Sequence, residues 1–229
     1  MGLREELLRM YELLEGYFGD LHWWPAAEPF EVMVGAILTQ NTAWTNVEKA
    51  IKALREKKLL TPAALFRIRE DKLATIIRPS GYYRLKAGRL KAFVRFFMDE
   101  YSGSVAAMRG EELPRLRNKL LDVRGVGPET ADSILLYACQ KPIFVSDAYT
   151  KRIIVRHGIL GDDADYLAIQ ALFMDHLRPD ASLFNQFHAM IVHTGKTFCR
   201  KAPQCAGCPL EILKADSPPS SFRRKASDS

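Results

Sequence analysis

A carboxylate that follows a glycine-containing turn between two predicted helices is the part of this sequence with the clearest chemistry. Residues 120–132 predict a helix, a tight turn through Gly125 and Gly127, and a second helix, and Asp147 stands at the start of the next helix. Glycine adopts backbone angles closed to other residues, and proline suits the first position of a helix. A helix start also offers N–H groups to an anion, such as a DNA phosphate. The segment therefore predicts a helix-hairpin-helix at about 119–138, followed by an acid.

The composition is that of a basic globular protein. The 229 residues are 48% hydrophobic and carry a formal net charge of +6. This charge fits a polyanionic partner, but many basic proteins bind no nucleic acid, so charge alone leaves the partner open. No apolar run approaches the ~20 residues that span a bilayer, and the N-terminus lacks the apolar core of a signal peptide. We therefore expect a cytoplasmic protein with no membrane association.

Helical periodicity runs through nearly the whole chain, and no convincing strand alternation appears. We therefore predict an all-α fold. The predicted helices include 29–38, 46–54, 83–101, 111–121, 128–138, 147–157, 166–177 and 181–193. The tail at 216–229 is polar, and we expect it to be flexible.

The hairpin and the acid behind it resemble motifs of the endonuclease III superfamily of DNA glycosylases, also called the HhH-GPD superfamily. The resemblance covers about residues 30–209. It implies two helical lobes: a six-helix barrel at 29–139, and a second lobe that joins 1–28 to 140–215 and carries a cysteine-rich loop at 199–208. It further implies that damaged double-stranded DNA binds in the cleft between the lobes, and that the protein is a monomer.

Asp147 is the residue to which we assign the chemistry. Cleavage of an N-glycosidic bond builds positive charge on the sugar, and a nearby carboxylate can stabilise that charge and orient or deprotonate a water molecule. The alternative is a plain helix N-cap, for which Asp is among the best residues. In the family the acid does both, so capping and catalysis do not exclude each other.

The resemblance also bears on whether the enzyme cuts the DNA strand. In bifunctional members a lysine two residues after the second hairpin glycine forms a Schiff base with the deoxyribose. Glu129 holds the matching position here, and a carboxylate cannot form an imine, which implies a monofunctional enzyme that uses water. An acid in a first helical turn is also favoured by the helix dipole, and both interpretations can hold. The hairpin residues predicted to contact DNA are Arg124, Gly125, Val126, Gly127, Glu129 and Thr130. By resemblance, a monovalent cation (Na+ or K+) would bind the backbone carbonyls of Leu121, Val123 and Val126.

Two tryptophan-containing segments are candidates for a base pocket. An enzyme that acts on a base must extrude it and hold it between apolar faces. Trp-Trp-Pro at 23–25 is ordinarily core filling, but followed by Leu-Thr-Gln-Asn-Thr at 38–42 it resembles one branch of the superfamily, 3-methyladenine DNA glycosylase III. An N-alkylated purine is cationic, so it stacks favourably on indole. We predict that Trp24 and Trp44 stack on the base, with Trp23 and Pro25 as walls.

Three further residues are placed near this pocket by resemblance. Lys196 would reach the pocket mouth, although a phosphate contact is an equal alternative. Asn41 matches the position of a family residue that fills the gap left by the flipped nucleotide, and Gln40 beside it could share the task. The alternative for Asn41 is a helix cap or turn residue.

Three cysteines near the C-terminus form a second candidate site. Cys199, Cys205 and Cys208 are closely spaced, which in a reducing compartment indicates metal rather than disulfides. They resemble the iron–sulfur loop common in the superfamily, but Lys214 stands at the position of its fourth cysteine. A [4Fe-4S] cluster with a non-cysteine ligand, a zinc ion completed by His or Asp, and free thiols all stay open.

Taken together, these features predict a monofunctional base-excision repair glycosylase that flips and releases an N-alkylated base of the 3-methyladenine type. One alternative is an endonuclease III-like glycosylase and AP lyase for oxidised or mismatched bases. Another is a non-catalytic helix-hairpin-helix DNA-binding protein, which would bind abasic-site DNA without releasing any base.

Overall fold

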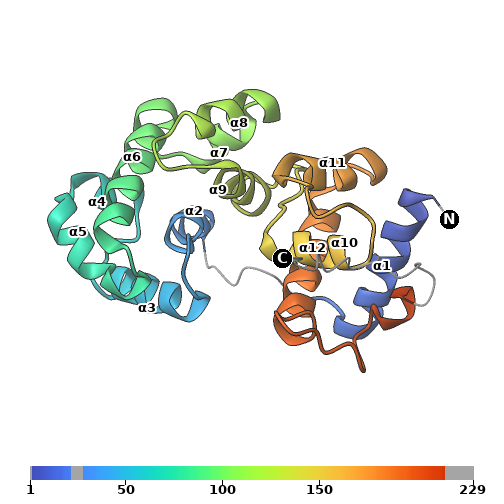
Figure 1. Ribbon diagram of the computed structural model, residues 1–229. Coiled ribbons are helices and arrows are strands. Elements are labelled where there is room, and N and C mark those ends of the chain that lie inside the picture. Colours follow the sequence, from blue (N-terminus) through green and yellow to red (C-terminus); the bar gives the residue numbers. More distant parts are fainter. Residues whose placement is uncertain (1, 22–27, 215–229) are drawn as a thin grey trace, which may run out of the picture. The chain divides into compact units, whose positions relative to one another are not determined.

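A computed structural model describes residues 2–21 and 28–214 (Figure 1). Every regular element in these residues is a helix and no strand occurs among them, so the all-α prediction is confirmed. No helix in this described part of the chain is both long and apolar enough to cross a membrane.

The described residues form two compact units. The smaller unit comprises 2–21, 146–178 and 186–214, and the larger comprises 28–145 and 179–185. The predicted arrangement of two lobes around a DNA-binding cleft stays a prediction.

The helix α2 (Pro29–Leu38) forms the centre of the larger unit. Pro29 starts it, and every residue from Phe30 to Leu38 is buried. Apart from Glu31, whose carboxylate is held by Arg55 at 2.7 Å, its side chains are apolar on every face, so the helix must be covered all round, unlike an amphipathic surface helix. It packs against α3 (Trp44–Glu56), α6 (Tyr83–Tyr101), α9 (Pro128–Ser133) and the π-helical turn η2 (Ile134–Ala138).

Short helices complete the larger unit. The elements are α4 (Pro62–Arg67), α5 (Glu70–Ile76), η1 (Arg78–Ser80), α7 (Val105–Gly110) and α8 (Leu113–Leu121). Both α4 and α5 pack on α6. Thr61 caps α4 by accepting a hydrogen bond from the backbone N–H of Ala64 at 3.3 Å, as the Thr-Pro pair there favours.

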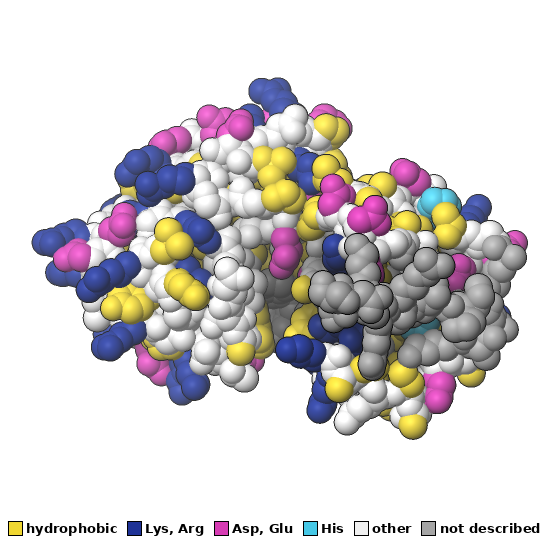
Figure 2. All heavy atoms as spheres, in the orientation of Figure 1, with side chains coloured by type: hydrophobic (Ala, Val, Ile, Leu, Met, Phe, Trp, Pro, Cys, Tyr) yellow, Lys and Arg dark blue, Asp and Glu magenta, His cyan; other side chains and the backbone are white. Residues whose placement is uncertain are grey.

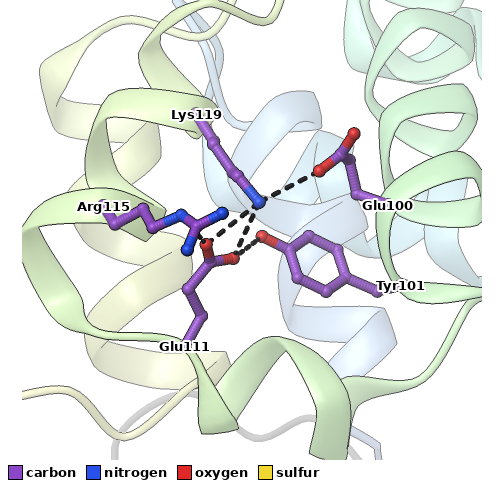
Figure 3. A network of polar contacts seen from close by, with 5 residues as sticks. All are labelled: Glu100, Tyr101, Glu111, Arg115 and Lys119. Atoms are coloured by element: carbon purple, nitrogen blue, oxygen red, sulfur yellow. Dashed lines mark hydrogen bonds and ion pairs between the residues drawn. The ribbon is translucent and has the colours of Figure 1, made fainter.

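A polar network joins the end of α6 to α8 (Figure 3). Glu111 accepts a hydrogen bond from the Tyr101 hydroxyl and forms ion pairs with Arg115 at 2.8 Å and with Lys119 at 3.0 Å. Lys119 also pairs with Glu100 at 3.0 Å. Burial, reinforced by the bond to Glu111, raises the pKa of Tyr101 to about 12, so the hydroxyl stays a donor. The network fixes the first helix of the hairpin on the larger unit.

Basic side chains gather over α3, α4 and α5 in the space-filling view (Figure 2). Several of them pair with acids of the same face: Arg69 lies 2.8 Å from Asp71, and Lys52 lies 3.9 Å from Glu56. Because both signs are interspersed, this face is a solvated mixed-charge surface rather than a continuous basic patch.

The smaller unit is built around aromatic packing. Its elements are α1 (Leu3–Phe18), α10 (Ala148–Arg156), α11 (Tyr166–His176), most of α12 (Ala181–Thr197) and η3 (Glu211–Lys214). Leu7, Met10 and Leu14 form the buried stripe of α1. Phe187 meets Tyr11 and Phe173 edge to face, at centroid distances of 5.4 and 5.3 Å.

Two predicted helices near the site have details that the sequence did not specify. The helical stretch at 128–138 has the predicted bounds but changes after Ser133 into the π-helical turn, where the N–H of Cys139 donates to the carbonyl of Ile134 at 3.0 Å. The helix predicted at 147–157 runs from Ala148 to Arg156, with Asp147 as its N-cap. Hydrophobic periodicity does not report such hydrogen-bond geometry near helix ends.

Candidate active site

The turn of the predicted hairpin is present between α8 and α9. Gly125 has φ +87°, and a Cβ on it would lie 2.3 Å from Cγ of Arg89. This glycine is therefore required by both its backbone angle and its close neighbour. Gly127, in contrast, is the N-cap of α9 with extended φ −95°, and nothing lies within 4 Å of a Cβ built there. Of the two turn glycines, only Gly125 therefore uses the backbone freedom of glycine in this structure.

A buried ion pair holds the two hairpin helices together. Nε of Arg117 in α8 lies 2.7 Å from Oδ1 of Asp132 in α9, and Nη2 lies 3.1 Å from Oδ2. The side chain of Asp132 is fully buried, and that of Arg117 is 19% exposed. This two-pronged geometry fixes orientation as well as distance.

The residues predicted to contact DNA differ in exposure. Arg124, Gly127 and Glu129 are exposed, whereas Val126 and Thr130 are buried. The start of α9 therefore presents a solvent-accessible surface that includes the Glu129 position. The DNA contacts and the cation site at the carbonyls of Leu121, Val123 and Val126 stay predictions.

Gln40 ties the loop after α2 to the hairpin. Its Nε2 donates to the Gly125 carbonyl at 3.0 Å and to Oγ1 of Thr130 at 2.9 Å. Its Oε1 accepts a hydrogen bond from Arg89. A side chain held by three partners within the protein positions the loop, and the role of Gln40 in filling a gap in the DNA stays a prediction.

Asn41, the next residue, has a different environment. It is exposed, and its φ is +51°. Asparagine tolerates this left-handed conformation better than most residues. The N-cap of α3 is Ala43, so Asn41 is a turn residue and not a helix cap. Of the two neighbours, Asn41 is the one whose side chain lies at the surface.

A buried lysine that the sequence analysis did not single out supports the same loop. Nζ of Lys86 donates to the carbonyl of Leu38, the last residue of α2, at 2.8 Å, and to that of Ser80 at 2.6 Å. Burial, with a smaller contribution from the charge of Arg89, lowers the pKa of Lys86 to about 8. A sequence signal existed: Lys86 falls in helical register with the buried Leu90, Phe93 and Phe97.

Tyr82 is another residue that the sequence analysis missed. It precedes α6 with φ +44°, and its ring is 70% exposed. A non-glycine residue in the left-handed region stores strain that the surrounding structure must hold. Ser80, two residues earlier, is fixed by Lys86. An exposed aromatic ring on a fixed turn is a candidate stacking surface.

Asp147 caps α10 as expected. Its Oδ1 accepts hydrogen bonds from the backbone N–H of Thr150 at 2.8 Å and from the Thr150 hydroxyl at 3.0 Å. Its Oδ2 lies 3.7 Å from Nε2 of His188, and its side chain is 15% exposed. Burial alone would raise the pKa of Asp147, but His188 and Thr150 outweigh this and hold it below its ordinary value. The group is therefore an ionised carboxylate at neutral pH.

The segment at 193–196 packs on Tyr149 of α10 within the smaller unit. A Cβ on Gly195 would lie 2.4 Å from Cδ1 of Tyr149, so only glycine allows the ring to rest there. The guanidinium of Arg152 lies 5.0 Å from the centroid of the same ring. Lys196 is exposed. Tyr149, two residues after Asp147, is an aromatic neighbour of the acid's helix that the sequence analysis did not predict.

The predicted base pocket is described only in part. Trp44 is the first residue of α3 and is half-buried. Trp23, Trp24 and Pro25 lie outside the described residues. The stacking roles of these four residues stay predictions.

The cysteine-rich loop is anchored by arginines of α10. Arg152 donates to the carbonyl of Cys199 at 2.6 Å. Arg156 donates to Sγ of Cys199 at 3.3 Å and to the carbonyls of Arg200 and Lys201 at 2.6 and 2.9 Å. These bonds tie the loop to α10.

The cysteines of this loop lie around one cavity. All four cysteines are described and none forms a disulfide. Cys199, Cys205, Cys208 and His157 line one cavity of about 310 Å³, its open mouth included. In the described ranges no three His, Cys, Asp or Glu side chains form a group that could hold a metal ion. The [4Fe-4S] cluster, the zinc ion and the free thiols of the sequence analysis therefore all stay open.

Comparisons with known proteins agree with these features. A protein of Methanocaldococcus jannaschii, whose name provisionally describes a DNA repair glycosylase, is 44% identical over 90% of this chain and 94% of its own length. The H. pylori 3-methyladenine DNA glycosylase MagIII, solved with 1,N6-ethenoadenine, superposes with a TM-score of 0.71 at 29% identity, over 86% of this chain and 98% of that one.

A trapped covalent complex of endonuclease III with DNA superposes with a TM-score of 0.79 at 26% identity, over 93% of this chain and 96% of that one. Residues 34–179 match the family described as HhH-GPD superfamily base excision DNA repair protein. The match includes the hairpin and the acid that follows it. The chain therefore belongs to the HhH-GPD superfamily of base excision DNA repair proteins.

Proposed function

We propose that this base-excision repair DNA glycosylase is monofunctional and releases N-alkylated bases of the 3-methyladenine type from double-stranded DNA. The observation that carries the proposal is the state of Asp147. Its carboxylate is fixed on one oxygen by Thr150, keeps 15% of its side-chain surface, and has a lowered pKa. An ionised and oriented acid of this kind is what the departure of a base from a sugar requires.

In the proposed reaction, the glycosidic bond between C1′ and the base nitrogen breaks and the bonding electrons leave with the base. The sugar gains positive charge, which Asp147 stabilises. Water then attacks C1′, and a proton of that water passes to the carboxylate of Asp147. The product is an abasic sugar with a hydroxyl group at C1′. An N3- or N7-alkylated purine is already cationic and departs neutral, so the reaction needs no second acid to protonate the leaving group.

The absence of an amine at the hairpin supports the monofunctional assignment. Glu129 occupies the first turn of α9 and is exposed. A carboxylate cannot form the Schiff base that strand cleavage by β-elimination requires. Water therefore remains as the nucleophile.

Two observations support an alkylated purine as the substrate. The superposition with MagIII extends over 98% of that enzyme, whose solved ligand is an alkylated adenine derivative. Trp44 starts α3 directly after the loop that Gln40 holds, and indole faces attract cationic bases. Trp23 and Trp24 would complete the stacking surface.

The test measures release of 3-methyladenine from methylated duplex DNA. The variant Asp147→Asn removes the charge but keeps a good N-cap, because Asn and Asp cap helices about equally well. We expect a loss of ~100-fold or more in the single-turnover rate. Equal rates for the wild type and Asp147→Asn would reject the role of the acid.

A matched control separates capping from catalysis. Asp165 caps α11 with the same geometry, accepting a hydrogen bond from the backbone N–H of Ala168 at 2.8 Å. The variant Asp165→Asn should retain the wild-type rate. A similar loss in both variants would mean that the effect comes from helix stability.

An AP lyase acting on oxidised or mismatched bases is the second candidate. The superposition with the endonuclease III covalent complex favours it, and Lys196 is an exposed amine on α12. Borohydride treatment during reaction with abasic-site DNA distinguishes the two. We expect no covalent adduct, and an adduct that disappears in Lys196→Met would establish the lyase. A panel of alkylated, oxidised and mismatched duplexes then ranks the substrates.

A further inference from the structure

We propose that His188 is a positioning residue for Asp147, an inference that rests on the proposed catalytic role of that acid. Nε2 of His188 fixes the carboxylate oxygen Oδ2, while Thr150 fixes the other oxygen, Oδ1. All three residues lie within the smaller unit: Asp147 caps α10, Thr150 lies in α10 and His188 lies in α12.

The two oxygens of Asp147 have different neighbours. Oδ1 accepts the hydrogen bonds from Thr150 that cap α10, at 2.8 and 3.0 Å. Oδ2 lies 3.7 Å from Nε2 of His188, within ion-pair range but longer than a direct hydrogen bond. Catalytic hydrogen bonds are commonly long before substrate binds and tighten in the complex. One oxygen therefore serves the helix, and the other is held for the reaction.

The imidazole of His188 has little room to move. Its side chain is 7% exposed. Phe187, its neighbour in α12, packs edge to face on one ring of α1 and one of α11, at 5.4 and 5.3 Å. Further along α12, Arg152 of α10 donates to the Gly195 carbonyl at 3.1 Å. The helix α12 is therefore held against α1 and α11 beside His188, and against α10 nearer its C-terminal end.

The charges around Asp147 fit this role. Burial acts to raise its pKa, and the contact with His188 opposes burial more strongly than the bonds from Thr150 do. Without His188, burial should dominate and the pKa of Asp147 should rise. Burial and the charge of Lys196 lower the pKa of His193, a second histidine on α12. The remaining ionisable side chains on the three surrounding helices are Tyr149, Lys151, Arg152 and Arg156 on α10, Tyr166, Asp175 and His176 on α11, and Lys196 on α12.

The experiment compares His188→Gln with His188→Leu in the full chain. Glutamine offers an N–H donor to Oδ2, and leucine fills similar space without one. Three quantities are measured for each variant: the thermal midpoint, the rate of 3-methyladenine release from pH 5 to 9, and the titration midpoint of the Asp147 carboxyl by carbon-13 NMR.

We expect the titration midpoint of the Asp147 carboxyl in His188→Leu to rise by about one pH unit or more. The acidic limb of the pH–rate profile of this variant should shift to higher pH with it. His188→Gln should recover much of the rate at pH 7 that His188→Leu loses. Because both variants replace the same buried ring, their thermal midpoints should be similar, and a recovery specific to glutamine identifies a donor rather than a packing group.

Three results would overturn the role of His188. They are an unchanged carboxyl midpoint in His188→Leu, equal rates for the glutamine and leucine variants, and rate losses that merely follow the thermal midpoints. The NMR titration needs no substrate, so it reports on the pair even where the reaction differs from the one proposed. If Asp147→Asn abolishes base release while both His188 variants keep the wild-type profile, the proposed function stands and this inference falls.

Discussion

Removal of one partner of the Arg117–Asp132 pair tests how the hairpin is held together. The pair makes two hydrogen bonds, at 2.7 and 3.1 Å, between the helices on either side of the turn. The variant Asp132→Asn keeps the shape of the side chain but removes its charge. It leaves the guanidinium of Arg117 opposite a neutral amide, one end of which is itself a donor.

The expected loss can be worked from the exposure of the two side chains. Breaking a buried ion pair by removing one partner costs about 3–5 kcal/mol. Arg117 keeps 19% of its side-chain surface, so water compensates in part and we expect the lower end, about 3 kcal/mol. In a chain of this length each 1 kcal/mol lowers Tm by about 2–4 °C. Asp132→Asn should therefore melt about 6–12 °C below the wild type.

Differential scanning calorimetry provides the measurement, and the chain offers an exposed pair as a control. Arg69 and Asp71 are also joined by two hydrogen bonds, at 3.1 and 2.8 Å, but their side chains are 75% and 62% exposed. Asp71→Asn should leave Tm unchanged, because exposed pairs contribute little. Equal shifts in Asp132→Asn and Asp71→Asn would refute the reasoning from burial. The double variant Arg117→Met with Asp132→Leu should recover most of the loss, since no unpaired charge remains.

Four other predictions follow from the site. Gln40→Ala should lower stability by about 1–3 kcal/mol, because it leaves buried hydrogen-bond partners unsatisfied. Asn41→Gly should not lower stability, since glycine accepts the left-handed backbone. A larger decrease in Tm for Asn41→Gly than for Gln40→Ala would contradict the role of Gln40 in holding the loop. The pKa of Lys86 falls from 10.5 to about 8 on folding, so between these pH values the unfolded chain binds the extra proton. The free energy of unfolding of the wild type, relative to that of Lys86→Met, should therefore increase between pH 8 and 10.5. Denaturant unfolding at several pH values measures this difference, and a difference that stays constant across the range would count against the prediction. Protein purified without oxygen should be yellow-brown with absorbance near ~400 nm and contain iron if the three thiolates hold a cluster. A colourless, iron-free protein would reject the cluster.

Features that depend on neighbours in the sequence could be predicted. Gly125 and Pro128 mark the hairpin because their backbone preferences are properties of single residues. Asp147 could be recognised as a helix start because its cap partner, Thr150, is three residues away. The long helices α2 and α6 follow from apolar spacing over ten residues or more.

Features that depend on partners far away in the sequence could not be predicted. Gln40 bonds to residues 85 and 90 positions later, and Lys86 to a carbonyl 48 positions earlier. Nothing in the local sequence separates a Gln that reaches DNA from one that reaches the hairpin. The helices α5 and α7 have seven and six residues, too few turns for periodicity to stand out from chance. His188 could be placed on a helix, but its distance from Asp147 is set by how α12 packs.

The basic side chains show why net charge alone did not identify the partner. Several of the most buried or most ordered cations donate to backbone carbonyls at or just beyond the ends of helices, where unpaired carbonyls and the negative end of the helix dipole attract them. They are Lys86 beyond α2, Lys91 beyond α4, Arg109 at η2, and Arg152 and Arg156 beyond α12. Donors engaged in this way are less available to a phosphate, so these residues stabilise the fold while exposed residues such as Arg124 keep their donors for DNA. The salt dependence of DNA binding should therefore reflect the exposed cations at the hairpin rather than the formal charge of +6.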